Sequence, residues 1–107
     1  MIPEGDADAF VPDPLLFIAT LGEAALEKAF FLCNRLRMKG IRVEIDHAGR
    51  SLKSQMKRAD KLKSVYTLIL GDREIQENKA LLRNMRASTQ EEIRLDSIEE
   101  TIMKIER

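Results

Sequence analysis

The sequence predicts an α/β fold in which three strands alternate with two helices, and a strand hairpin and a last helix follow. Unbroken apolar runs begin at Leu15 and Val65, and such runs are typical of strands buried on both faces. Between them lie two segments in which apolar residues recur at spacings of three and four, which is the helical period. Because strand–helix–strand connections are right-handed, we expect the first three strands to be parallel, with helices packed on the sheet.

The first strand is expected over residues 15–20 (LLFIAT) and a helix directly after it. Thr20 with Glu23 three residues later forms a capping-box pattern, which predicts a helix start there. Gly40 follows the last helical position and has the place of a C-terminal cap. The expected buried stripe of this helix consists of Leu26, Phe30, Cys33 and Leu36.

The second strand, residues 41–46 (IRVEID), alternates strictly between apolar and charged residues. Ile41, Val43 and Ile45 would face the core, so we expect a strand at the edge of the sheet. A turn (HAG) leads into the second helix. Its expected inner face is formed by Leu52, Met56, Ala59 and Leu62, and its outer face by Lys53, Lys57, Asp60 and Lys61.

The C-terminal part begins with a third apolar strand over residues 65–70 (VYTLIL). Residues 79–85 and 90–95 are strand-like and are separated by RAST, which predicts a hairpin. Asp96 is then expected to cap a last helix whose inner face carries Ile98, Ile102 and Ile105.

Length and composition indicate one domain. A chain of 107 residues can bury a sizeable core without disulfides, and the single Cys33 cannot form an internal one. No apolar run reaches the roughly 20 residues of a membrane span, and the start lacks a signal-peptide pattern, so a soluble cytoplasmic domain is expected. Residues 1–14 are acidic and proline-bearing, which predicts a linker or tail ahead of a domain at residues 15–107.

Positive charge is concentrated in the second helix, although the whole chain is neutral. Residues 49–63 (GRSLKSQMKRADKLK) contain six Lys and Arg against Asp60, which leaves +5. Such a face can bind phosphates, but it can equally be a solvated helix surface.

Catalytic motifs are absent from the sequence, which has no P-loop, GxGxxG, HExxH or CxxC. His47 is the single histidine and lies in a predicted turn, where it is either exposed to solvent or in contact with a ligand. Cys33 falls on an apolar stripe and is expected to be a buried core residue. No catalytic residue, metal ligand or cofactor site is predicted.

Residues 41–85, which contain GRSLKSQMKRADKL followed by LILGDREI, resemble the C-terminal anticodon-binding domain of class IIa aminoacyl-tRNA synthetases. Within that group the Gly-Arg-Ser-Leu-Lys run most resembles the histidyl enzymes, because the prolyl, threonyl and glycyl enzymes typically carry an Asp-x-Arg segment there. The resemblance covers about residues 15–106.

The resemblance implies a three-layer α/β/α domain with a mixed five-stranded sheet and three main helices, in the order β-α-β-α-β-β-β-α. It also implies recognition of a tRNA anticodon stem-loop, that of a histidine tRNA, as a domain or fragment of a ligase used in protein biosynthesis. ATP and magnesium would belong to a separate catalytic domain, so no turnover is expected from this chain. The isolated domain is expected to be a monomer and the parent enzyme a homodimer.

Two other functions stay open at this point. A synthetase-like domain can serve protein interaction or regulation without a role in aminoacylation. A small flavodoxin-like enzyme could use the same crevice for a phosphorylated ligand, but the sequence offers neither a phosphate loop nor a catalytic constellation.

The sequence departs from the family pattern at two turns. Asn78 stands where a glycine is common, and asparagine tolerates positive φ better than most residues, so the turn is expected to survive. Lys63-Ser64 replaces a small pair before the third strand and adds charge to a loop.

We expect the RNA site at the carboxyl ends of the parallel strands, where open α/β sheets bind ligands. The predicted crevice lies between residues 20–22 and 71–74, with residues 46–50 at its border. Arg50, Lys53 and Lys57 are expected to hold phosphates, and Glu44, Gln55 or Glu74 to contact base edges, with His47 near them. Arg83 and Arg86 form a second, less favoured contact line.

Overall fold

The structure is a computed structural model that describes residues 15–45 and 51–106, with side chains up to residue 104. The predicted tail at residues 1–14 lies outside these ranges. The elements are β1 (Leu16–Leu21), α2 (Glu23–Met38), β2 (Val43–Ile45), α3 (Leu52–Lys61), β3 (Tyr66–Gly71), α4 (Asp72–Gln76), β4 (Lys79–Asn84), β5 (Thr89–Arg94), a 3-10 turn η1 (Leu95–Ser97) and α5 (Ile98–Glu106).

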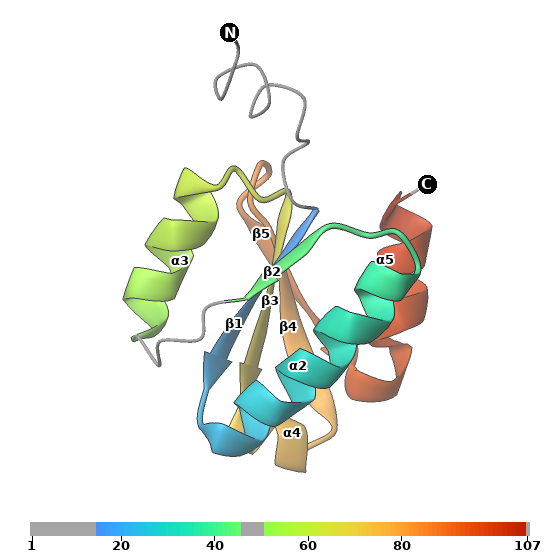
Figure 1. The fold of residues 1–107 in the computed structure, drawn as a ribbon. Helices are drawn as coiled ribbons and strands as arrows, with labels where there is room; N and C mark the ends of the chain where they lie inside the picture. The colour runs from blue at the N-terminus through green and yellow to red at the C-terminus, as the bar shows by residue number, and fades with distance from the viewer. Residues whose placement is uncertain (1–14, 46–50, 107) are drawn as a thin grey trace, which may run out of the picture.

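The five strands form one mixed sheet in the order β2-β1-β3-β4-β5. β1 runs parallel to both β2 and β3, while β3–β4 and β4–β5 are antiparallel (Figure 1). The predicted parallel strands, the edge position of the second strand and the hairpin are confirmed. The short helix α4, which directly follows β3, was not predicted.

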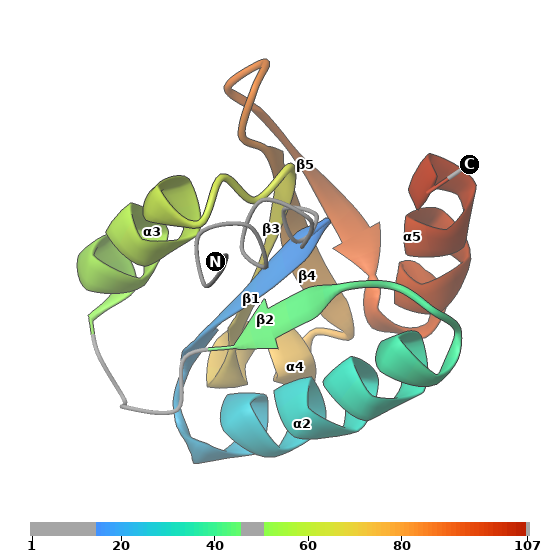
Figure 2. The same cartoon turned by 45° about the horizontal axis from the view of Figure 1, so that its top comes forward.

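The helices cover the two faces of the sheet unequally. α2 and α5 lie on one face and α3 lies alone on the other, so the domain has three layers (Figures 1 and 2). The strand residues alternate accordingly, with Leu68 facing α2 and α5 and Ile69 facing α3. Among the described residues, α3 is therefore the single helix beside the part of this face that belongs to β4 and β5.

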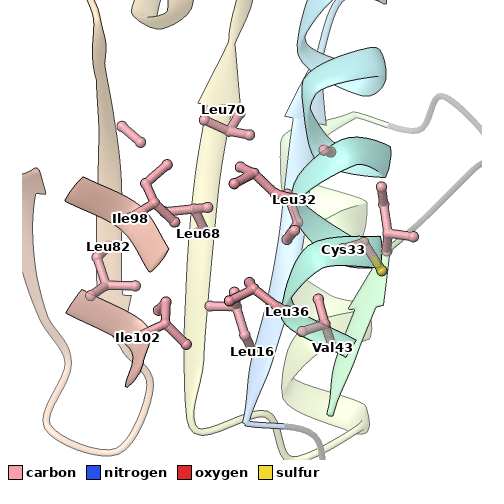
Figure 3. Packing of buried hydrophobic residues seen from close by; sticks show 14 of the residues in the cluster. Leu16, Leu32, Cys33, Leu36, Val43, Leu68, Leu70, Leu82, Ile98 and Ile102 are labelled. Atoms are coloured by element: carbon pink, nitrogen blue, oxygen red, sulfur yellow. The ribbon is translucent and has the colours of Figure 1, made fainter. Parts of the chain in front are cut away.

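The larger core cluster lies between the sheet and the helices α2 and α5. Figure 3 shows Leu32 and Leu36 of α2 and Ile98 and Ile102 of α5 pointing toward the aliphatic side chains of the strands. Ile98 and Ile102 are completely buried, as the spacing predicted, and Ile105 lies outside the described side chains. The smaller cluster under α3 contains Phe17, Ala19, Ala59 and Ile69.

Two predictions for α2 hold only in part: the helix starts where expected and Cys33 and Leu36 are buried, but the capping box and Phe30 differ. The helix begins at Glu23 with Gly22 as its N-cap, and no side chain of this segment caps it, so the capping box of Thr20 and Glu23 does not form. The predicted stripe is also rotated, because Phe30 is 42 % exposed. The buried stripe instead consists of Ala25, Ala29, Leu32, Cys33 and Leu36. Alanines allow α2 to pack close to the sheet, which a stripe of larger residues would prevent.

The ends of α2 and α3 share one geometry, the Schellman motif. Beyond α2, Gly40 has a φ of +86°, its N–H donates to Arg37, and the Ile41 N–H donates to Leu36 at 3.1 Å. This confirms the predicted role of Gly40. Beyond α3, the same place is taken by Lys63, which has a φ of +59°.

The turn before β4 keeps its left-handed residue. Asn78 has a φ of +59°, so asparagine tolerates there the conformation that the family commonly gives to glycine, as predicted. The start of the last helix is displaced, however. Asp96 lies inside the 3-10 turn η1, and α5 begins two residues later at Ile98.

Candidate nucleic-acid interface

Helix α3 is positioned by the N-cap residue that precedes it and by one apolar face. Ser51 is the N-cap and its hydroxyl accepts a hydrogen bond from the Ser54 N–H at 3.2 Å, which satisfies one of the free donors of the first turn. Ala59 is buried against the sheet. Leu52, Met56 and Leu62 pack partly buried around the same cluster, which confirms the predicted inner face.

The charge of α3 is strongly positive. The helix carries Lys53, Lys57, Arg58 and Lys61 against Asp60, so four cations and one acid leave +3. Lys53 and Lys57, which were predicted to hold phosphates, are both exposed. Within the described ranges, none of these four cations forms an ion pair.

Among the described residues outside α3, five cations form ion pairs. Arg35 and Lys39 pair with Glu99, and Lys79 pairs with Glu77 and Glu92 at 2.8 and 3.1 Å. The remaining pairs are Arg73 with Glu77 and Arg94 with Asp96. Positive charge that is left without a counterion on one helix is available to an anionic partner.

A groove of about 620 Å³ lies between α3 and the strands β3, β4 and β5. Figure 2 shows α3 on the side of the sheet opposite α2 and α5. We call this space the α3–hairpin groove. The apolar residues that line it, here called its floor, are Leu52, Met56, Ile69 and Met85. The polar and charged residues that line it, here called its rim, are Lys53, Lys57, Asp60, Arg83 and Gln90.

Arg83 is placed in the groove by the sheet register. It lies opposite Thr67 of β3 on one side and opposite Gln90 of β5 on the other. Opposite residues point to the same face of a sheet, here the face toward α3. The structure therefore brings Arg83, from the second predicted contact line, together with Lys53 and Lys57. Arg86 is exposed in the hairpin turn and does not line this groove.

Gln55 lies inside the protein. Its side chain is 1 % exposed, its Oε1 accepts from the Thr20 N–H and its Nε2 donates to the Thr20 carbonyl, both at 2.8 Å. Sequence reasoning named this residue as a reader of base edges. In the structure its amide oxygen is occupied by the end of β1.

The predicted crevice between residues 20–22 and 71–74 is occupied by side chains. A Cβ at Gly22 would overlap the Asp72 carboxylate, and a Cβ at Gly71 would overlap Glu74. The Asp72 Oδ1 accepts a hydrogen bond from the Ala25 N–H at 2.9 Å and so caps α2. The carboxyl ends of β1 and β3 thus close on each other, while the open space lies beside α3.

The other predicted site residues are not gathered in the groove. Glu44 lies half-buried on the edge strand β2 and lines a separate shallow groove with Arg37 and Arg42. Glu74 lies on α4 over Gly71. His47 and Arg50 lie outside the described residues.

Gln90 and Met85 are groove residues that sequence reasoning missed. The signal for them was present in the predicted hairpin, because alternate positions of paired strands face the same side. The sequence does not reveal on which side of the sheet α3 lies. It therefore does not reveal which of the two alternating sets of hairpin residues faces α3.

Cys33 is a buried core residue, as predicted. Cys33 is 2 % exposed, and burial raises the pKa of its thiol, which keeps it protonated and unreactive. No cluster of three or more His, Cys, Asp or Glu side chains suited to a metal ion occurs in residues 15–45 and 51–106. Across the same ranges, no helix is long and apolar enough to cross a membrane.

Comparison with known proteins places these observations in a family. A family model described as "Anticodon binding domain" matches residues 16–105. The histidine–tRNA ligase of Thermoanaerobacter sp. (strain X514) is 47 % identical over 90 residues, which are 84 % of this chain and 22 % of the relative. That of Syntrophotalea carbinolica is 41 % identical over 104 residues, which are 97 % of this chain and 25 % of the relative.

Solved structures agree with the sequence relatives. The apo histidyl-tRNA synthetase of S. aureus superposes with a TM-score of 0.80 at 38 % identity, over 87 % of this chain and 28 % of that one. The RNA-binding domain of threonyl-tRNA synthetase from Cryptosporidium parvum shares the fold, with a TM-score of 0.74 at 20 % identity over 86 % of this chain and 23 % of that one. The chain thus spans about a fifth to a quarter of the length of the curated relatives described here. On this basis the chain belongs to the anticodon-binding domain family, and its relatives in that family are histidyl-tRNA synthetases.

Proposed function

We propose that this domain binds the anticodon arm of a tRNA, that of a histidine tRNA, in the α3–hairpin groove. The single observation that carries the proposal is the set of three cations, Lys53, Lys57 and Arg83, which surround an apolar floor and have no counterion among the described residues. The family membership supports the choice of RNA as the partner.

The groove matches the two chemical parts of a single-stranded loop. Phosphates would lie along the cationic rim, where each neutralised phosphate releases counterions. Unstacked bases would lie against the apolar floor of Leu52, Met56, Ile69 and Met85, with the Gln90 amide and the Asp60 carboxylate able to contact their edges. Arg50 and His47, outside the described residues, and Glu44 and Glu74 remain predicted contacts.

The relatives' activity suggests the wider role. They are named histidine–tRNA ligases, and together with a catalytic domain this chain would position the tRNA for ligation of histidine. By itself it would bind and not catalyse.

The proposal can be tested by titrating a fluorescent histidine anticodon hairpin at several salt concentrations. If three phosphates are neutralised, log K should fall with log salt with a slope of about −2, because each contact on a single strand contributes roughly −0.7. The variant Lys53→Ala with Lys57→Ala should bind more weakly and make this slope shallower by about 1.4.

The matched control is Arg58→Ala with Lys61→Ala. It removes the same charge from the same helix, but neither residue lines the groove. Equal losses from the two variants would mean that α3 acts only through its overall charge. If the affinity does not change with salt, or if the hairpin does not bind at all in the fluorescence titration, the RNA proposal is contradicted. Those outcomes would favour a protein-interaction domain.

A further inference from the structure

The pairing of Gln55 with Thr20 joins α3 to the sheet through directional bonds. The two residues are 35 positions apart, and both hydrogen bonds are 2.8 Å long and buried. Ala59 is the other buried residue of α3, and Leu52, Met56 and Leu62 are only partly buried. Apolar contacts are not directional, so this amide is the contact that fixes one orientation of the helix.

The Gln55 amide takes the place of a neighbouring strand. The register of β1 with β2 ends at Ile18 opposite Ile45, two residues before Thr20. The Leu16 N–H donates to Arg42 just ahead of β2, so alternate residues of β1, which include Thr20, present their backbone groups to this side. Beyond the described end of β2, the side chain of Gln55 satisfies the N–H and the C=O that a strand residue would otherwise bind.

This anchor bears on the groove through the geometry of the helix. Successive residues of an α-helix are about 100° apart around its axis, so Lys53 and Lys57, two positions before and after Gln55, both project about 160° away from it. A rotation of α3 about its axis would move both cations relative to Arg83, which is fixed by the sheet.

We propose that Gln55 is a positioning residue for RNA binding, and that it holds Lys53 and Lys57 opposite Arg83 across the α3–hairpin groove. The inference rests on the proposed function. In this proposal Gln55 does not contact a base directly. It acts by holding the helix that carries the two lysines in one orientation.

The test compares Gln55→Met with Leu36→Val, a control that destabilises the core on the opposite face of the sheet. Methionine keeps the length and the helix propensity of glutamine but leaves the Thr20 backbone groups without their partner. Both variants are titrated with the anticodon hairpin at a temperature at which both are fully folded, as verified by circular dichroism. A further variant, Gln55→Asn, is used if Gln55→Met does not fold, because its amide is one methylene too short to keep both bonds.

We expect Gln55→Met to bind the hairpin about tenfold more weakly and with a salt slope shallower by about 0.7, as if one phosphate contact were lost. Leu36→Val should retain the affinity and slope of the wild type. A Gln55 variant that keeps both would overturn the positioning role, as would an equal loss in Leu36→Val, which would show an effect of stability alone. If the wild type does not bind the hairpin, both the proposed function and this inference are refuted. The wild-type titration alone decides this outcome, so it is distinguishable from a failure of the positioning role.

Discussion

Asp72, the first residue of α4, caps helix α2 by accepting a hydrogen bond from Ala25, which lies 47 residues earlier in the chain. Its Oδ1 accepts the Ala25 N–H at 2.9 Å, while Gly22 leaves room for the carboxylate above the helix start. The free N–H groups of a helix N-terminus are usually satisfied by a local side chain, and here a tertiary contact replaces it. The same contact closes the carboxyl ends of β1 and β3 on each other.

Replacing Asp72 by Ala should lower the free energy of unfolding by about 1 kcal/mol, the usual loss for an N-terminal cap. Urea denaturation at neutral pH measures the change. Asp60→Ala, on exposed helix surface, is the control and should change stability by less than about 0.5 kcal/mol. A loss in Asp72→Ala no larger than in this control would contradict the capping role.

The closeness of Gly22 and Asp72 supports a second measurement on the same pair. Gly22 has a φ of +113°, and a Cβ there would overlap the Asp72 carboxylate, so Gly22→Ala should destabilise the domain. In an Asp72→Ala background the overlap is absent and the loss should be smaller, although the backbone strain remains. Strict additivity of the two changes would show that the residues do not interact.

Replacing Lys63 by Gly should stabilise the domain by about 0.5–1 kcal/mol. Lys63 occupies the left-handed position after α3, with a φ of +59°, and glycine adopts this conformation without steric cost. Thermal unfolding followed by circular dichroism detects the increase. Lys57→Gly, inside the helix, removes the same charge and should instead destabilise by about 1 kcal/mol. Destabilisation by Lys63→Gly would refute the assignment of this turn.

Replacing Thr67 by Val should raise the free energy of unfolding by about 1 kcal/mol. The Thr67 side chain is completely buried and its hydroxyl has no hydrogen-bond partner among the described residues. Removing this hydroxyl from water on folding therefore costs free energy that no hydrogen bond offsets. Valine has nearly the same shape without the hydroxyl. Thr67→Ser keeps the hydroxyl and loses the methyl group, and it should therefore destabilise. A loss of stability in Thr67→Val, measured by urea denaturation, would indicate that a bound water satisfies this hydroxyl.

The strands could be predicted because their signals are local. The alternation of Ile41, Val43 and Ile45 and the unbroken run at residues 65–70 each reflect the burial of one strand. All three isoleucine and valine side chains are buried as expected, although β2 itself comprises only Val43–Ile45 of the predicted residues 41–46. The left-handed turn at Asn78 was likewise predicted from the conformational tolerance of one residue type.

Two of the incorrect predictions concern α2 and its contacts with distant segments. The helix start at Thr20 and Glu23 looked complete in sequence, yet Asp72 supplies the cap. Phe30 looked like a core residue at helical spacing, but it is 42 % exposed, and α2 instead buries a stripe that includes Ala25 and Ala29.

The sequence by itself determined the order of the elements, the family and the helix that carries the positive charge, because each depends on a local period or on a run of residues. The tertiary structure decided how the candidate site is arranged. It filled the predicted crevice with Asp72, turned Gln55 inward onto Thr20, and brought Arg83 beside Lys53 and Lys57. Those outcomes depend on which face of the sheet α3 covers and on contacts between segments that are distant in sequence, and neither is encoded in the pattern of a single segment.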